Sequence, residues 1–249
     1  MLMRAERALA SVCLLLGLAG CGHVHAAQVA FEAEEARQGV AVDEDYVYVV
    51  GTQCIGKYDK RTHERLAHWE ASDALPIIHL DSGVVVDQRL YCAHSNYPEK
   101  PMTSSVEIWD ADTLEHVGNH SFGIGHGSCT WVDRHDGWWW VAFAHYAGHG
   151  GYPDRDNAWT TLVRYDDEWR EREAWVFPKD VLERFGDYSC SGGSWGPDGR
   201  LYCTGHDRPE LYALALPEAG SVLRLVRLVP FPNDGQGIAF DRSTPPMLY

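Results

Sequence analysis

The sequence has little positive charge. Its 249 residues include 21 Lys and Arg against 36 Asp and Glu, which gives a formal net charge of −15. Because a surface of this sign is repelled by phosphate backbones, we expect no nucleic-acid partner. Hydrophobic residues make up 45% of the chain and charged residues 23%, which predicts a globular protein with a sizeable core.

Several chemical signatures are also missing. The chain has no C-x-x-C pair, no phosphate-binding loop and no dinucleotide fingerprint. A zinc ribbon, a thioredoxin-type site and nucleotide chemistry are therefore not indicated. The run Ser-Gly-Gly-Ser at 191–194 is interpreted as a glycine-rich strand near a crowded axis.

No apolar run is long enough to span a bilayer. The N-terminal run Ala8–Leu18 has 11 residues and follows Arg4 and Arg7, which is the pattern of a signal peptide. The run is followed closely by Cys21, and the sequence Leu-Ala-Gly-Cys resembles the bacterial lipobox. This resemblance implies cleavage before the cysteine and attachment of a lipid to its thiol.

The lipobox implies an exported protein. Residues 1–20 are predicted to be a lipoprotein signal peptide and 21–28 a tether, so the protein is expected in the periplasm or at the cell surface, held to the membrane by its lipid alone. Gly22 after the cysteine implies the outer membrane in enteric-type lipoproteins. An ordinary secretory signal cut near Ala26 and Ala27 is the alternative.

An odd number of cysteines remains beyond these segments. They are Cys54, Cys92, Cys129, Cys190 and Cys203. Cys190 and Cys203 fall on neighbouring predicted strands, and one disulfide between them is compatible with an exported protein. The alternative is that all five are small apolar side chains in packed strands.

A motif that ends in aspartate recurs through the chain. Its copies are Gln38–Asp43, Ser82–Asp87, Ser128–Asp133, Gly192–Asp198 and Gln236–Asp241. The aspartates lie 44, 46, 65 and 43 residues apart, close to the length of a four-stranded propeller blade. The abundance of aromatic residues and of Gly, with 24 glycines, also favours short strands joined by tight turns.

Each copy continues with the same series of strands. Second strands are predicted at Tyr46–Gly51, Arg89–His94, Trp138–His145 and Arg200–His206. Third strands end in the pairs Tyr58-Asp59, Trp109-Asp110 and Tyr165-Asp166, and fourth strands follow at Glu64–Trp69 and Glu115–Phe122. The sequence therefore predicts an all-β fold, a five-bladed β-propeller of four-stranded antiparallel blades.

The chain ends are predicted to close the ring. Val29–Glu34 alternates as a strand before the first repeat and is assigned to the outer edge of the last blade, so the propeller domain covers 29–249. The fifth unit breaks off at Met247–Tyr249, so we expect the last blade to be truncated. One helix is predicted, at Pro178–Phe185, with Gly186 as its stop.

These motifs resemble those of bacterial exported five-bladed β-propeller proteins. The Gly-Val/Ile-x-x-Asp and aromatic-Asp motifs are also similar to the wider propeller group that includes WD-repeat proteins, gluconolactonase-like proteins and proteins labelled as cycloisomerases. The resemblance implies an architecture and carries no catalytic set, since one propeller scaffold hosts many functions.

Six histidines map to one face of the predicted ring, at the starts of first strands or the ends of second strands. They are His79, His94, His126, His145, His149 and His206. Imidazoles that converge from separate blades are good ligands for a divalent metal ion, and the predicted metal ligands are His79, His126, His145 and His206. The alternative is that these rings hydrogen-bond within blades, as the Gly-His pair of WD repeats does.

Two long polar loops leave the same face, and long loops on rigid scaffolds commonly form sites. They are Ser95–Pro101 and Tyr146–Asn157. The predicted ligand-binding residues are His94, Tyr97, His149, Arg155 and Arg208, with Lys100 as a further cation. The predicted catalytic residues are His145, His206, Tyr146 and Asp207, the last two in proton transfer. Solvated loop polarity is the alternative for each.

The sequence thus predicts a His-lined pocket for a small polar ligand, such as a sugar derivative or an organic acid. One hypothesis is a metal-assisted hydrolase, lyase or isomerase, in which the ion polarises an oxygen or activates water. The other is a non-catalytic propeller for ligand or protein binding at the cell envelope. The run Trp138–Trp140 suggests a carbohydrate platform, but strand alternation favours core filling.

Overall fold

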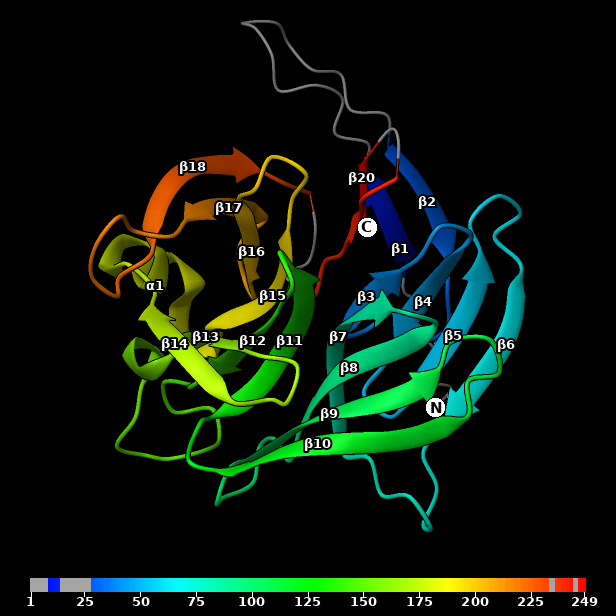
Figure 1. Ribbon diagram of the computed structural model, residues 1–249, viewed down its shortest axis with the longest axis horizontal. Helices are drawn as coiled ribbons and strands as arrows, with labels where there is room; N and C mark the ends of the chain where they lie inside the picture. The colour runs from blue at the N-terminus through cyan, green and yellow to red at the C-terminus, as the bar shows by residue number, and fades with distance from the viewer. Residues whose placement is uncertain (1–8, 14–27, 233–235, 244–245) are drawn as a thin grey trace, which may run out of the picture.

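The described chain is built almost entirely of antiparallel four-stranded sheets. The computed structural model describes residues 9–13, 28–232, 236–243 and 246–249 (Figure 1). Blade 1 comprises β3 (Gly39–Val42), β4 (Tyr46–Val50), β5 (Cys54–Asp59) and β6 (Arg65–Glu70). Blade 2 comprises β7 (His79–Val86), β8 (Arg89–Ser95), β9 (Thr103–Asp110) and β10 (His116–Ile124).

Two further blades follow in the same order. Blade 3 comprises β11 (Ser128–His135), β12 (Trp138–Ala144), β13 (Thr161–Tyr165) and β14 (Glu171–Val176). Blade 4 comprises β15 (Cys190–Trp195), β16 (Leu201–Gly205), β17 (Glu210–Ala215) and β18 (Arg224–Pro230). First strands lie inside the ring and fourth strands outside it (Figure 1). The propeller of four-stranded antiparallel blades is therefore confirmed.

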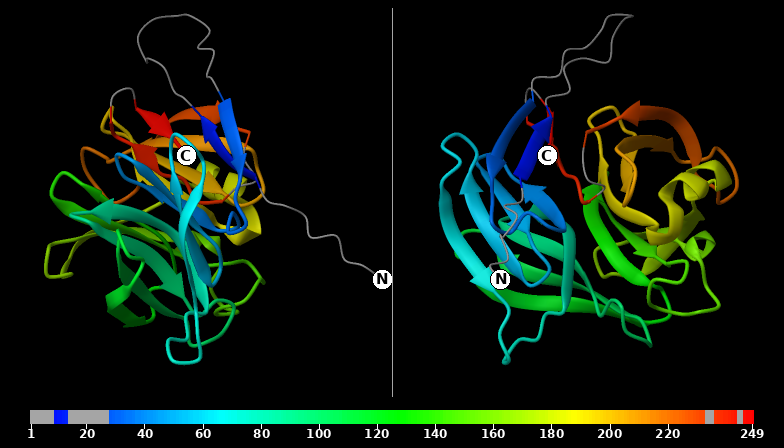
Figure 2. Two further views of the ribbon diagram at one scale, coloured as in Figure 1. Left: turned by 90° about the vertical axis from the view of Figure 1, so that its right-hand side faces the viewer. Right: turned by 180° about the vertical axis from the view of Figure 1, so that it is seen from behind.

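The fifth blade differs from the prediction. The remaining sheet has the order β19 (Phe240–Asp241), β20 (Met247–Leu248), β1 (Leu9–Cys13) and β2 (Gln28–Glu32), so both chain ends contribute to it (Figure 2). Its two C-terminal strands have only two residues each. The structure thus shows four blades made of consecutive strands, not five, because the sheet that contains β19 and β20 takes its other two strands from the N-terminal segment. Closure of the ring stays a prediction.

The N-terminal predictions fall largely outside the described residues. The proposed lipid-bearing Cys21 lies there, as do residues 1–8 and 14–27. The described segment β1 belongs to the predicted signal peptide, and β2, which overlaps the predicted closing strand, pairs with it at the outer edge of the sheet. Within the described residues, no helix has the length and apolar character needed to cross a membrane.

The recurring aspartates form turns. Asp43 Oδ1 accepts hydrogen bonds from two backbone N–H groups of the following turn, and its Oδ2 accepts one from the Tyr48 hydroxyl at 2.8 Å. Asp198 repeats this arrangement with its own turn and the Tyr202 hydroxyl at 2.9 Å. Asp43 and Asp198 therefore each join a first strand to a second strand.

The core lies between the blades. Trp139 and Trp140 are both buried and pack in different hydrophobic clusters on either side of blade 3, which confirms that this run fills the core. The predicted helix is present as α1 (Lys179–Phe185) and ends at Gly186, whose φ of 68° suits glycine. Cys190 and Cys203 are buried free thiols in one cluster.

The glycine-rich run in β15 leaves room for a buried tryptophan. A Cβ added at Gly193 would lie 2.3 Å from the ring of Trp131, which is 0% exposed. We expect Gly193→Ala to lower the free energy of unfolding by about 1–3 kcal/mol, because the ring has no space to move into. Urea unfolding measures the loss. Gly118→Ala is the control, since its added Cβ would meet nothing within 4 Å; equal midpoints for the two variants would contradict the prediction.

Candidate functional site

The channel between the blades is closed at its middle. A Cβ added at Gly39 would lie 2.7 Å from the Ser82 Cα, and one at Gly192 would lie 2.7 Å from the Gly237 Cα. A Cβ at Gly237 would in turn lie 2.6 Å from the Ser82 Cβ. Backbones from four sheets therefore meet at the axis, and the two ends of the ring are separate candidate sites.

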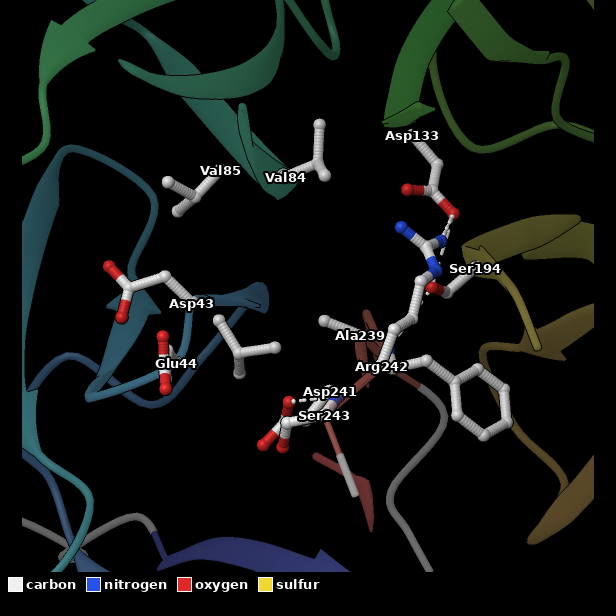
Figure 3. A pocket seen from close by; sticks show the side chains of 13 residues that line it. Asp43, Glu44, Val84, Val85, Asp133, Ser194, Ala239, Asp241, Arg242 and Ser243 are labelled. Carbon is white, nitrogen blue, oxygen red and sulfur yellow. Dashed lines mark hydrogen bonds and ion pairs between the residues drawn. The ribbon is translucent and has the colours of Figure 1, made fainter. Parts of the chain in front are cut away.

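One end of the ring opens into an acidic cavity of about 480 Å³ (Figure 3). The cavity lies where the first strands end, and its charged lining residues are Asp43, Glu44, Asp133, Asp241 and Arg242. Figure 3 shows Arg242 extending toward Asp133, with which it forms an ion pair. Asp241 pairs with Lys60 at 2.7 Å. These carboxylates are engaged in holding chain segments together, and the sequence analysis did not foresee the cavity.

The two predicted long loops form one cover over the opposite end of the ring. The Gly151 N–H donates to the Pro98 carbonyl at 3.1 Å, and a Cβ at Gly150 would lie 2.7 Å from Pro98. Below this contact, Tyr97, Met102, Tyr146 and Tyr152 pack in one apolar cluster. Close approach of the loops requires glycine at 150, where φ is 96°.

His94 is held inside blade 2 by hydrogen bonds. Its Nε2 accepts from the Ile78 N–H at 3.1 Å, so Nδ1 carries the proton and donates to the Ser105 hydroxyl at 2.9 Å. The Ser105 hydroxyl donates to Glu107, whose other oxygen lies 2.8 Å from His116 Nε2. Burial lowers the pKa of His94, and its two nitrogens are both in use.

His145 is also engaged near its own blade. Its Nε2 donates to the backbone carbonyl of His126 at 3.1 Å, and the His126 ring packs against Phe143 with centroids 4.8 Å apart. Burial lowers the pKa of His145, whose Nδ1 is buried without a hydrogen bond to any described residue. The predicted metal ligands His126 and His145 are therefore neighbours, but the contact is between the His145 ring and the His126 backbone, not between the two rings.

The remaining predicted residues of this face lie around a tyrosine. The rings of His149 and His206 stack on Tyr188 with centroids 4.2 and 4.4 Å away. His206 Nδ1 lies 2.7 Å from Asp207 Oδ1. His149 Nε2 lies 3.7 Å from Asp187. Each imidazole is thus paired with a carboxylate near the surface.

The predicted cations are spread apart. Arg155 donates to the Gly125 carbonyl at 3.0 Å and lies over the rings of Tyr152 and Trp159. Arg208 lines a second cavity of about 490 Å³ beside β17 and β18, and Lys100 is exposed. Arg155 therefore fastens its own loop, and the structure does not bring these three side chains into one anion site.

The four predicted metal ligands do not form one group. In the part of the chain that the structure describes, no set of three or more His, Cys, Asp and Glu side chains is placed to hold a metal ion. His79 lies beside Asp81, and His206 lies beside Asp207. The divalent metal ion therefore remains a prediction.

Asp81 is the feature of this end that sequence analysis missed. Asp81 is only 5% exposed, and its side chain forms no hydrogen bond with any described residue. Its Oδ2 lies 3.7 Å from His79 Nε2. Burial raises the pKa of Asp81 well above 3.8, whereas burial and the nearby His94 lower the pKa of His79 to about 4. His79 is therefore uncharged at neutral pH and does not balance a negative charge on Asp81.

Irregular strand pairing accompanies the enclosed polar side chains. The register of β7 shifts between Leu80 and Gly83, and equivalent shifts occur in β11 around Thr130 and in β15 around Ser191. A bulge changes the direction in which side chains leave a strand. Thr130 Oγ1 is buried without a partner among the described residues. Three first strands thus deviate at the level where Asp81 lies.

Asp81→Asn is expected to raise the free energy of unfolding at neutral pH by about 1–3 kcal/mol, because a buried carboxylate without a partner destabilises the fold. The raised pKa of Asp81 means that wild-type protein loses stability as the pH rises above 3.8, and Asn lacks this loss. Urea unfolding of both proteins at about pH 4 and about pH 8 measures the difference. A difference that does not grow with pH would contradict the prediction.

Comparisons with known proteins add no function. No protein family and no curated protein matches the chain. Among solved structures, it is similar to a protein of unknown function from Bacteroides caccae, with 10% identity and a TM-score of 0.49 over 88% of this chain and 72% of that one. It is also similar to hydrazine synthase of Kuenenia stuttgartiensis, with 11% identity and a TM-score of 0.49 over 81% of this chain and 76% of that one.

Proposed function

We propose that the chain is an exported, lipid-anchored propeller that binds a small polar ligand at the cell envelope, beneath the two loops that cover one end of the ring. The supporting observation is a set of buried polar groups at this end that make no hydrogen bond to any described residue: Thr130 Oγ1, His145 Nδ1 and the Asp81 carboxylate, whose one ion-pair contact is with His79. Buried polar groups are almost always hydrogen-bonded, and a ligand would supply the missing partners.

Ligand binding is tested by thermal unfolding of the full chain against a panel of sugars, hydroxy acids and amines. We expect at least one class to raise the melting temperature in a saturable way, since a ligand that binds the folded state alone stabilises it. The rise should be lost in Tyr97→Ala, beneath the loops, and kept in Glu44→Gln, at the opposite end. No shift with any compound, or an equal shift in Tyr97→Ala, would overturn the proposal.

A metal-assisted hydrolase, lyase or isomerase is the competing function. It has less support, because His94 and His145 make hydrogen bonds near their own blades and His206 pairs with Asp207. The metal content of purified protein decides the question when His145→Ala and His206→Ala are each compared with wild type. A metal lost in both variants would favour the enzyme, and full metal content in both would count against it.

We also propose that a lipid on Cys21 anchors the protein. Cys21→Ser is expected to move the protein from the membrane fraction to the soluble fraction of cells, and unchanged fractionation would contradict a lipid at this position. We further propose that β2 and the C-terminal strands β19 and β20 close the ring of the mature protein, from which cleavage before Cys21 removes β1. Contacts of Arg242 with blades 3 and 4 support this assignment.

A further inference from the structure

The end of the ring beneath the loops contains a carboxylate that no positive group balances. Among the described residues, the one ion-pair contact of Asp81 is with His79, whose ring is neutral at neutral pH. Arg155, the loop cation, is committed to a backbone carbonyl and two aromatic rings. An ionised Asp81 would therefore have no positive partner at this position, within a chain whose net charge of −15 attracts cations.

Aromatic rings surround the same carboxylate. Tyr97 lies 5.2 Å from the ring of His79 and 4.9 Å from that of Tyr146, measured between centroids. Tyr146 is close enough to Asp81 that, after burial, the negative charge of Asp81 is the next cause that raises its pKa. Contacts thus run from Asp81 through His79 and Tyr97 to Tyr146, which also senses the charge of Asp81. The faces of tyrosine rings attract cations, and a nearby carboxylate adds to that attraction.

Other ligand classes fit these groups less well. An organic acid would bring a second negative charge beside Asp81, which costs free energy in a buried place. A calcium ion takes six to eight oxygen ligands, and Asp81 is the one carboxylate of this series. A small organic cation needs only one counter-ion and aromatic surface. Asp81 can serve as the counter-ion, and Tyr97 and Tyr146 provide the aromatic surface.

Resting on the proposed ligand-binding function, we propose that this end of the ring binds a small organic ammonium ion, with the Asp81 carboxylate as its counter-ion and the rings of Tyr97 and Tyr146 against its charged head. The ion reaches the site when the loop contact between Gly151 and Pro98 opens. Binding would supply the positive partner that Asp81 lacks, so the bound carboxylate is ionised.

The test titrates the full chain with methylammonium and tetramethylammonium chloride at constant ionic strength and follows binding by calorimetry and melting temperature. We expect saturable binding to wild type and at least a tenfold weaker affinity for Asp81→Asn, since a charge-assisted contact is lost. Asp81→Asn is expected to be more stable than wild type, so weaker binding would not reflect unfolding. Glu44→Gln, which removes an exposed carboxylate at the opposite end, should bind as wild type does.

A second variant tests the aromatic contribution. Tyr97→Leu should weaken tetramethylammonium binding more than methylammonium binding, because a quaternary head has no N–H to donate and depends more on ring faces. Equal affinity of wild type and Asp81→Asn, or equal stabilisation by sodium or calcium chloride, would overturn the ammonium site. Binding of a sugar independent of Asp81 would overturn this inference alone, whereas the absence of binding by every class would overturn the proposed function as well.

Discussion

Asp133→Ala is expected to lower the free energy of unfolding by about 3 kcal/mol, because the side chain is a buried acceptor for several groups. Asp133 is 2% exposed, and its Oδ2 accepts hydrogen bonds from the Trp195 N–H at 2.7 Å and from the Ser194 hydroxyl at 3.2 Å. The same oxygen pairs with the guanidinium of Arg242. Alanine would leave the Trp195 N–H buried without its acceptor and would leave Arg242 with one contact to blade 3, its hydrogen bond to the Arg134 carbonyl.

Urea unfolding measures this loss, and Asp198→Ala provides the control. Asp198 has the same place in the repeat of blade 4, but it holds only its own turn and Tyr202, so about 1 kcal/mol is expected. Hydrogen exchange adds a local readout, since the Phe240 N–H donates to Ser194 and should lose protection in Asp133→Ala. Equal losses in the two variants would show that Asp133 does not connect the blades to the C-terminal segment.

The blades could be predicted from the sequence because their information is local. Asp43 and Tyr48 bond each other five residues apart, and a similar Asp–Tyr contact links Asp198 and Tyr202, so the repeat carries its own hydrogen bonds. The terminal sheet could be predicted only in part in this way. The strand at Val29–Glu34 was assigned to it, but its strands come from segments at both chain ends, and the pairing of β20 with β1 leaves no short-range pattern.

For the candidate site, the sequence could indicate only the end of the ring at which it lies. The sequence placed His94 and His145 at the ends of second strands, but it did not fix where their ring nitrogens point. In the structure, both rings make hydrogen bonds to neighbouring residues. Asp81 gave no signal, because its enclosure depends on a register shift in β7 and on loops from blades 2 and 3. The sequence therefore indicated the end of the ring where we propose the site, and it gave no signal for Asp81.

The second large effect concerns the segment that follows β2. Glu35 is 1% exposed and accepts hydrogen bonds from the Tyr58 hydroxyl at 2.6 Å, from Arg65 at 2.9 Å and from His68 at 2.7 Å. Glu35→Ala is expected to lower the free energy of unfolding by about 3–5 kcal/mol, because three groups of blade 1 lose one buried acceptor. The neighbouring Glu34 pairs with the same arginine but is exposed, so Glu34→Ala should cost less than about 1 kcal/mol.

The pH dependence separates Glu35 from a simple packing effect. Burial alone would raise its pKa, but hydrogen bonds from Tyr58, its own backbone, His68 and Arg65 outweigh burial and lower the pKa below 4.5. The contribution of Glu35 is therefore complete above pH 4.5 and is lost as the pH falls through the lowered pKa. Wild type should lose stability faster than Glu35→Gln on acidification, as measured by urea unfolding. Parallel pH profiles would mean that Glu35 is not ionised in the folded protein, which would contradict the prediction.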